Sequence, residues 1–321
     1  MEPTSHIINT LKIRGSWGEL GNQNTENLYP YIQLMKFVAQ DPDSHWLINN
    51  SRPNTANAPD LISALLGWET MRSWNIGFDL GMLNNRLTVS FDWFNRKTIN
   101  MVGPAPELPV TLGANVPKMN NADMQSTGFE LDLGWRDRIK DFDYGVHLLL
   151  SDDRQKILKY PNTTGKINTW YVGKYNGDIW GFETIGIAKS QEEMDAHLAS
   201  LPNGGQDALG VKWGAGDIMY RDLNGDGKIS DGATLNDPGD KKVIGNTSPR
   251  FRFGLDLNAS WKGIDVRLFF QGVAKRDAWL NDNMFWGATG GIWQSACFTS
   301  HLDFFREEGD DFWSANKDAY F

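Results

Sequence analysis

The amino-acid sequence predicts an all-β fold, namely the antiparallel wall of a transmembrane β-barrel with long extracellular loops. Apolar and polar residues alternate along several segments, the pattern of strands with one apolar and one polar face. Short turns alternate with long connections, as in outer-membrane barrels. The 321 residues include 14 Trp and 17 Phe, which such barrels place at their membrane borders. No apolar run reaches the ~18 residues of a transmembrane helix.

The clearest alternation lies in two segments, Trp74–Leu80 and Leu87–Trp93, which flank a polar turn at Leu83–Arg86. Alternation with period two around an Asn-Asn turn predicts an antiparallel hairpin. The same pattern predicts further strands at Phe129–Trp135, Tyr144–Leu150, Phe251–Trp261, Ile264–Phe270, around Leu11–Trp17 and over Tyr31–Val38. A tight turn at Lys262–Gly263 and a short one at Asp137–Asp141 connect neighbouring strands.

The polar faces of these strands distinguish a barrel wall from a β-sandwich. They carry charges in mid-strand, whereas the apolar faces carry none; the charges are Asp79, Asp92, Glu130, Asp132, Asp256 and Arg267. In a wide barrel the apolar face meets lipid and the charged face lines a watery lumen. Aromatic residues occupy strand ends, where membrane borders are expected: Trp74, Trp93, Phe94, Trp135 and Trp261.

The lengths of the connections predict three regions. Residues 1–158 contain barrel strands and loops, residues 159–249 form one long extracellular loop, and residues 250–321 contain a barrel hairpin followed by a further loop. Within the long loop, Ser190 and Glu193 have the spacing of a capping box, which predicts a short helix through Leu198.

The same loop contains Asp222-Leu-Asn-Gly-Asp-Gly-Lys228, the first half of a calcium-binding loop. Oxygen ligands are expected from Asp222, Asn224, Asp226 and the carbonyl of Lys228, and Gly227 permits the sharp turn. The usual final Glu is replaced by Ala233, so Asp231, or more distantly Asp237 or Asp240, would complete the shell. We expect a structural Ca²⁺ site; the alternative is a polar turn that binds no ion.

Composition and motifs exclude several functions. A net charge of −9 without a basic stripe argues against a nucleic-acid partner. The single cysteine, Cys297, excludes a disulfide framework. No HExxH, GxSxG or phosphate-binding glycine motif occurs in a suitable context, so we predict that the chain is not an enzyme. The alternatives are a secreted calcium-containing carbohydrate-binding β-sandwich and, less favoured, a β-rich glycan hydrolase.

Aromatic residues of the long loop are candidates for stacking on a ligand. They are Trp170, Tyr171, Tyr175, Trp180 and Phe182. The competing interpretation is that they pack the loop against its neighbours or against a partner protein. No substrate can be identified from these residues.

Several stretches together resemble the SusC/RagA family of TonB-linked outer-membrane proteins. They are LKIRGSWGELGNQN (Leu11–Asn24), Trp68–Thr98, NNADMQSTGFELDLGW (Asn120–Trp135), GDIMYRDLNGDGKIS (Gly216–Ser230), Val243–Val273 and the tail around Asp318–Phe321. This resemblance implies part of a barrel of about 22 strands in the outer membrane of a Gram-negative bacterium. It also implies a SusD-like lipoprotein partner, a TonB complex acting through an N-terminal part, and import of an oligosaccharide or peptide.

The resemblance leads to one further expectation. The signal peptide, TonB box and plug of the family are not found in this sequence, and about a third of the expected strands can be counted. We therefore expect a fragment truncated at both ends. Its open sheet edges would prevent insertion or transport by the chain alone, because lipid does not satisfy unpaired backbone groups.

Overall fold

The computed structural model describes residues 7–23, 32, 35, 37–56, 59, 61, 66–104, 118–280, 298–307 and 314–319. Cys297 and several residues between Tyr31 and Lys36 lie outside this set. The chain divides into two compact units. The first comprises residues 1–163, 170–176 and 249–275, and the second comprises residues 164–169, 177–248 and 276–321.

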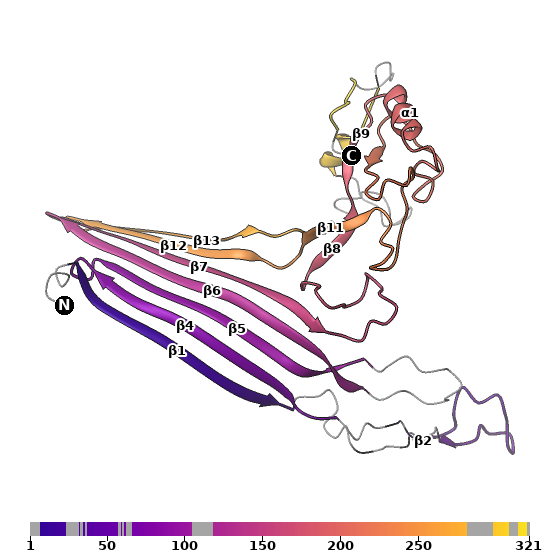
Figure 1. Ribbon diagram of the computed structural model, residues 1–321, viewed down its shortest axis with the longest axis horizontal. Helices are drawn as coiled ribbons and strands as arrows, with labels where there is room; N and C mark the ends of the chain where they lie inside the picture. Colours follow the sequence, from indigo (N-terminus) through magenta and orange to yellow (C-terminus); the bar gives the residue numbers. More distant parts are fainter. Residues whose placement is uncertain are drawn as a thin grey trace. The chain divides into compact units, whose positions relative to one another are not determined.

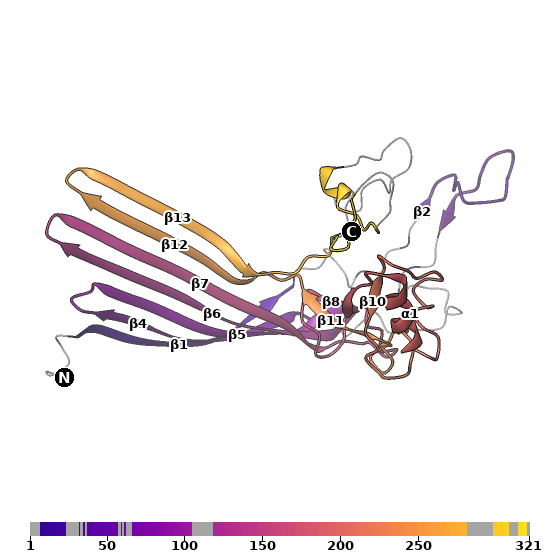
Figure 2. The same cartoon turned by 90° about the horizontal axis from the view of Figure 1, so that it is seen from above.

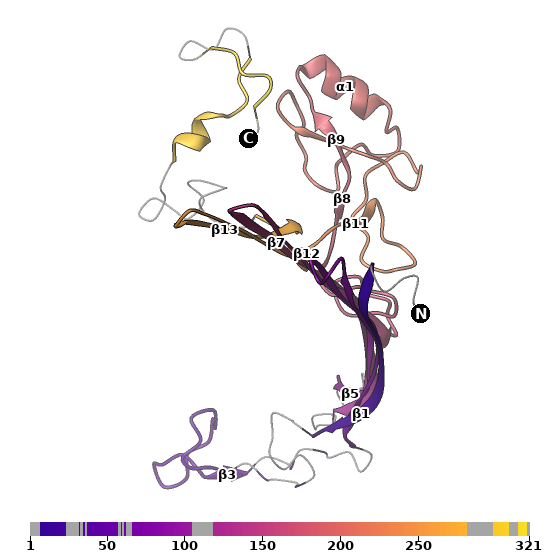
Figure 3. The same ribbon diagram turned by 90° about the vertical axis from the view of Figure 1, so that its left-hand side faces the viewer.

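The first unit is built on one antiparallel sheet of seven strands, which curves from edge to edge (Figures 1 and 3). The strands are β1 (Ile8–Asn22), β4 (Glu69–Met82), β5 (Leu87–Gly103), β6 (Met119–Ile139), β7 (Phe142–Lys159), β12 (Arg250–Trp261) and β13 (Ile264–Lys275). Their order in the sheet follows their order in the chain. Among the described residues, β1 and β13 each pair on one side only, so the sheet is an open section of a barrel.

Every long strand predicted from alternation is present, and most extend further than the alternation indicated. β6 has 21 residues and β7 has 18. The predicted strand over Tyr31–Val38 is the exception, because only β2 (Phe37–Val38) is described there; β2 pairs with β3 (Thr55–Ala56). Figure 2 shows the long strands side by side, with tight turns joining neighbours at one end of the sheet.

The register brings the apolar side chains of successive strands into one band. Leu11, Leu80, Val89, Leu133, Leu148, Leu255 and Phe270 are a row of direct cross-strand partners. Along β12 the band runs from Phe253 to Trp261, about 26 Å at about 3.3 Å per residue. A tilt of about 40° reduces this height to about 20 Å, of the order of the ~25 Å band of outer-membrane barrels. Ile13 (77 %) and Ile76 (55 %) are largely exposed.

The tight turns depend on left-handed backbone conformations. Leu83, Asn84 and Asn85 have φ angles of 54°, 59° and 60°. Asparagine tolerates this region better than most residues, which explains the Asn-Asn pair between β4 and β5. At the turn between β12 and β13, Lys262 (φ 45°) precedes Gly263 (φ 86°).

The second unit contains two small sheets and a helix. β8 (Asp178–Phe182) pairs with β11 (Lys241–Asn246), and β9 (Thr184–Ile187) pairs with β10 (Ile218–Tyr220). The helix α1 (Gln191–Ala199) confirms the predicted capping signal. The Ser190 hydroxyl accepts a hydrogen bond from the Glu193 N–H at 3.3 Å, and the Glu193 carboxylate accepts one from the Lys189 N–H at 2.7 Å.

Buried apolar side chains hold α1 against β10. Met194 from the helix is fully buried with Ala188 and Met219, and Leu198 and Trp213 pack against this cluster. A 3-10 helix at Thr299–Leu302 also belongs to the second unit. Within the described residues, no helix is long and apolar enough to cross a membrane; α1 has nine residues.

Candidate functional site

The charged face of the seven-stranded sheet is the face opposite the apolar band. Arg14 on β1 stands opposite Gly77, Gly77 opposite Asp92, and Asp92 opposite Glu130, so the register forms one row across four strands. The adjacent row contains Asp79, Ser90 and Asp132 in the same way. The predicted mid-strand charges therefore lie on one face, as the alternation indicated.

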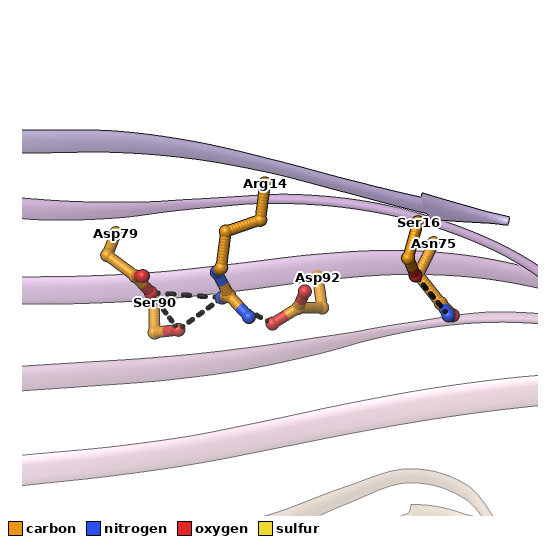
Figure 4. Close-up of polar contacts among 6 residues, drawn as sticks. All are labelled: Arg14, Ser16, Asn75, Asp79, Ser90 and Asp92. Carbon is orange, nitrogen blue, oxygen red and sulfur yellow. Dashed lines mark hydrogen bonds and ion pairs between the residues drawn. The ribbon is translucent and has the colours of Figure 1, made fainter.

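Arg14 is the centre of a hydrogen-bonded network on this face (Figure 4). Its Nη2 donates to Asp79 Oδ1 at 2.9 Å, to Asp92 Oδ2 at 2.7 Å and to Ser90 Oγ at 3.1 Å. The Ser90 hydroxyl in turn donates to Asp79 at 2.8 Å. Three neighbouring strands are thus connected through a single guanidinium.

Gly77 makes this network possible. A Cβ atom built at position 77 would stand 2.8 Å from Asp92 Cγ, so a larger residue would displace that carboxylate. The side chains of Arg14, Asp79 and Asp92 remain 31–38 % exposed, so the network borders an open hollow and water can reach it. Ser16 and Asn75 are joined by a hydrogen bond of 3.1 Å (Figure 4). Both also line the hollow.

Two further hydrogen-bonded pairs of side chains occupy the charged face. His147 Nε2 lies 2.7 Å from Asp132 Oδ1, and Arg267 Nε donates to Asp256 at 2.8 Å. By contrast, Glu130 makes no ion pair with any described residue. Half-exposed, paired charges of both signs form a polar surface suited to contact with a hydrated solute or with another polypeptide. The three pairs connect neighbouring strands and do not gather around one reactive atom.

The predicted calcium loop lies in the second unit and adopts the compact turn that its glycines permit. Gly225 and Gly227 have φ angles of 75° and 78°. Asp222 accepts hydrogen bonds from the N–H groups of both glycines, at 2.6 Å and 2.8 Å. Asn224 accepts from the N–H of Asp226 at 2.9 Å, and Asp226 accepts from that of Lys228 at 3.1 Å.

Asp240, rather than Asp231, joins the other two aspartates of the loop. Carboxylate oxygens of Asp222, Asp226 and Asp240 lie within 4.8 Å of one another. Asp240 is fully buried and accepts hydrogen bonds from the N–H groups of Leu223 and Ser230, both at 2.7 Å. Asp231 instead forms an ion pair with Lys241.

A lowered pKa keeps the Asp222 carboxyl ionised, and an ionised carboxylate can bind a cation. Although partial burial opposes it, the N–H groups of Gly227 and Gly225 hold the pKa of Asp222 below its usual range. Three oxygen-bearing groups at this spacing suit a hard cation such as Ca²⁺. The same carboxylates also accept several backbone hydrogen bonds, so the loop has internal partners of its own.

The five candidate aromatic residues occupy different surroundings. Trp170, Tyr171 and Tyr175 belong to the first unit, and Trp180 and Phe182 to the second. Arg154 covers Tyr175 at 4.2 Å from the ring centroid, and Phe182 packs edge-on against Tyr220 at 5.5 Å. Tyr171 is buried, whereas Trp170 is 37 % exposed.

Comparison with known proteins identifies the family. A family model described as "TonB dependent receptor-like, beta-barrel" matches residues 5–294. The chain belongs to this TonB-dependent receptor β-barrel family. The match covers all seven strands of the sheet, and it confirms the all-β barrel fold predicted from alternation.

Individual receptors support the predicted resemblance to SusC and RagA. TonB-dependent receptor P3 of Formosa agariphila is 26 % identical over 83 % of this chain and 26 % of its own length. TonB-dependent receptor SusC of Bacteroides thetaiotaomicron is 26 % identical over 81 % of this chain and 24 % of its own length. This chain thus spans about a quarter of the curated receptors that it matches.

A solved structure described as the RagAB peptide transporter has the same fold. It superimposes with a TM-score of 0.63 and 21 % identity, and the match covers 98 % of this chain and 31 % of that one. At this identity the likeness concerns the fold alone. The open seven-stranded sheet is therefore a section of a receptor barrel, with the band and the charged face on its two sides.

Because the pKa of Asp222 is lowered in the folded protein, we expect the effect of Asp222→Asn on stability to depend on pH. A carboxyl whose folded pKa is lowered stabilises the fold above its unfolded pKa of about 3.9, and this stabilisation is lost as pH falls through the folded value. We expect Asp222→Asn to lower the melting temperature of the receptor's loop region near pH 7. The difference from the unsubstituted protein should shrink as pH drops below about 4.

Thermal unfolding followed by tryptophan fluorescence between pH 3 and pH 7 measures this effect. Asp207→Asn is the matched control, because the Asp207 carboxylate is exposed and accepts no hydrogen bond from any described residue. A difference between Asp222→Asn and the unsubstituted protein that stays constant over this range would contradict the assignment.

Proposed function

We propose that this chain supplies part of the barrel wall and the extracellular loops of a SusC/RagA-type TonB-dependent transporter in the outer membrane of a Gram-negative bacterium. The observation that carries the proposal is the strict separation of two faces over seven strands in register. One face is a continuous apolar band, and the other is a row of hydrogen-bonded charges. A bilayer outside and a hydrated lumen inside require this division.

The proposed transporter acts with a SusD-like lipoprotein and imports oligosaccharides or peptides, driven by a TonB complex through a part of the receptor outside this sequence. The SusC relative and the solved RagAB peptide transporter support this proposal. Half-exposed ion pairs on the charged face suit the passage of hydrated solutes. Of the loop aromatics, Trp170 has the exposure that stacking on a ligand requires.

The alternative functions fit the molecule less well. A carbohydrate-binding sandwich buries its apolar faces between two sheets, whereas Ile13, Trp17 and Ile76 are 55–77 % exposed here. A glycan hydrolase requires two carboxylates on either side of a bound sugar. The acids of the charged face are instead mostly engaged by Arg14, His147 and Arg267. The family consists of receptors and transporters, and we propose no covalent chemistry for this chain.

Deletion of the gene that encodes the receptor tests the proposal. We expect the tagged receptor to fractionate with the outer membrane and to co-purify with a SusD-like lipoprotein. Its deletion should abolish the uptake of a fluorescent oligosaccharide or peptide, and a plasmid copy should restore uptake. A receptor found in the soluble fraction, or undiminished uptake of both ligand classes in the deletion strain, would refute the proposal.

We also propose that the loop from Asp222 to Asp231 binds one structural Ca²⁺ ion through Asp222, Asn224, Asp226 and the Lys228 carbonyl, with Asp240 as a further ligand. The convergence of three carboxylates within 4.8 Å favours an ion over a simple turn. Asp231 can join the shell only if it leaves Lys241. The fully buried Asp240 also orients the backbone of the loop.

Removal of Ca²⁺ distinguishes the ion site from a hydrogen-bonded turn. We expect a calcium chelator to lower the melting temperature of the loop region by several degrees and to increase proteolysis between Arg221 and Lys241. Asp226→Asn should weaken Ca²⁺ binding by about tenfold or more, because it removes one anionic ligand. Asp237→Asn, outside the carboxylate cluster, is the control. If chelation changes neither property, the loop is a turn without an ion.

A further inference from the structure

A row of basic side chains crosses the apolar face of the sheet, directly beyond its aromatic border. Direct cross-strand partners form this row, in the order Glu19, Arg72, Lys97, Gln125 and Lys156. We call Arg72, Lys97 and Lys156 the basic row. It lies on the same face as the apolar band, because each member is an even number of residues from an apolar neighbour on its own strand.

Two tryptophans mark the border next to the row. Trp17 and Trp74 are direct cross-strand partners, with ring centroids 6.3 Å apart, and they are 57 % and 54 % exposed. On β4, Arg72 lies two residues before Trp74, on the side away from the apolar band. Exposed tryptophans next to a lipid-facing band are typical of the level of the lipid headgroups. The basic row is therefore at headgroup height.

The border is hollowed where the row meets the tryptophans. Trp17, Trp74, Arg72 and Lys97 line this hollow together with Glu19 and Asn95. Its apolar side can hold the upper part of an acyl chain, and its basic side can hold an anionic group. This combination of surfaces matches an amphiphile with a negatively charged headgroup.

The charges of the row are only partly neutralised within the protein. Arg72 donates to Glu19 at 2.5 Å. Lys97 is exposed and makes no ion pair with any described residue. At the far end, Lys156 lies over the Tyr175 ring at 5.6 Å and makes no ion pair with any described residue. Arg154 lies 4.2 Å from the same ring and interacts with the charge of Asp152. Positive charge thus remains for a ligand.

At the opposite border of the band, the described strands form no row of basic cross-strand partners. There the strands end in tight turns, and Arg86 pairs with Asp137 at 3.2 Å. The basic row stands at the end with the long connections, which are extracellular in barrels of this kind. Because the basic row lies at the extracellular end of the strands, we expect it to face the outer leaflet of the membrane.

We propose that the basic row and the Trp17–Trp74 hollow form a binding site for a phosphorylated glycolipid of the outer leaflet. The phosphate groups contact Lys97, Lys156 and Arg72, and an acyl chain packs beside the two tryptophans. This site rests on the proposed outer-membrane location of the barrel. It would anchor the receptor at a fixed height in the bilayer through contacts independent of the transported solute.

Native mass spectrometry of the complete receptor in detergent micelles tests the site, with lipid A and dephosphorylated lipid A as the probes. We expect lipid A to bind the unsubstituted receptor and the dephosphorylated form to bind much less. Lys97→Gln combined with Lys156→Gln should weaken lipid A binding about 25-fold, since each basic residue near a charged membrane surface contributes about fivefold. Neither lysine forms an ion pair with a described residue, so the substitutions break no ion pair within the described sheet.

Lys12→Gln combined with Lys262→Gln is the matched control, because it removes the same charge from the other face and from the turn end. Lipid A binding should be unchanged in this control. Equal losses in both double variants, a loss below about threefold in the first, or equal binding of both lipids would overturn the proposal. Heat-modifiable electrophoretic mobility of each variant reports barrel formation separately, so failure of the lipid site is distinguishable from failure of the barrel itself.

Discussion

The register between neighbouring strands determines every other feature of the first unit. Side chains alternate between the two faces of a sheet, so a slip of one residue would exchange the faces of a whole strand. If β1 slipped by one residue against β4, Arg14 would enter the apolar band and Ile13 the charged face. Burial of an unpaired guanidinium in lipid costs several kcal/mol, so a correct register is strongly favoured. The two-faced wall and both of its surfaces follow from this constraint.

The Arg14 network reinforces the register from the polar side. One guanidinium reaches Asp79 on β4 and Asp92 on β5, with Ser90 bridging between them. Exposed ion pairs contribute little to stability individually, but this network can form in only one alignment of the three strands. The main contribution of the network is therefore to the correct alignment of these strands rather than to the stability of the fold. Gly77 allows it by leaving space between the two strands that Arg14 spans.

The fold was largely predictable because its dominant signal is local. Alternation over Trp74–Leu80 and Leu87–Trp93 depends only on which residues face lipid, and it identifies strand and face together. Of the strand predicted over Tyr31–Val38, only Phe37–Val38 is described as a strand, and several of the other residues lie outside the described set. The family resemblance was confirmed by the barrel match over residues 5–294.

The partners within each site were less predictable, because they depend on register and on contacts distant in sequence. Alternation around Leu11 and Ile13 places Arg14 on the polar face, but the sequence does not indicate that it meets Asp79 and Asp92. Asp231 follows the calcium motif most closely in sequence, yet the fold turns it toward Lys241 and brings Asp240 to the loop. The sequence offered Asp240 only as one of two more distant ligands, and its burial became visible in the structure alone.

The separation of this sheet into a lipid-facing side and a water-facing side underlies the proposed function. Single cysteines along β4 of the complete receptor, at Trp74, Asn75, Ile76, Phe78 and Asp79 in a Cys297→Ser background, test this separation directly in bilayers. We expect cysteines at the even positions to resist a water-soluble maleimide, and fluorophores attached there to be quenched by lipid-borne nitroxides. The odd positions should show the reverse. Labelling without this alternation would contradict a barrel wall.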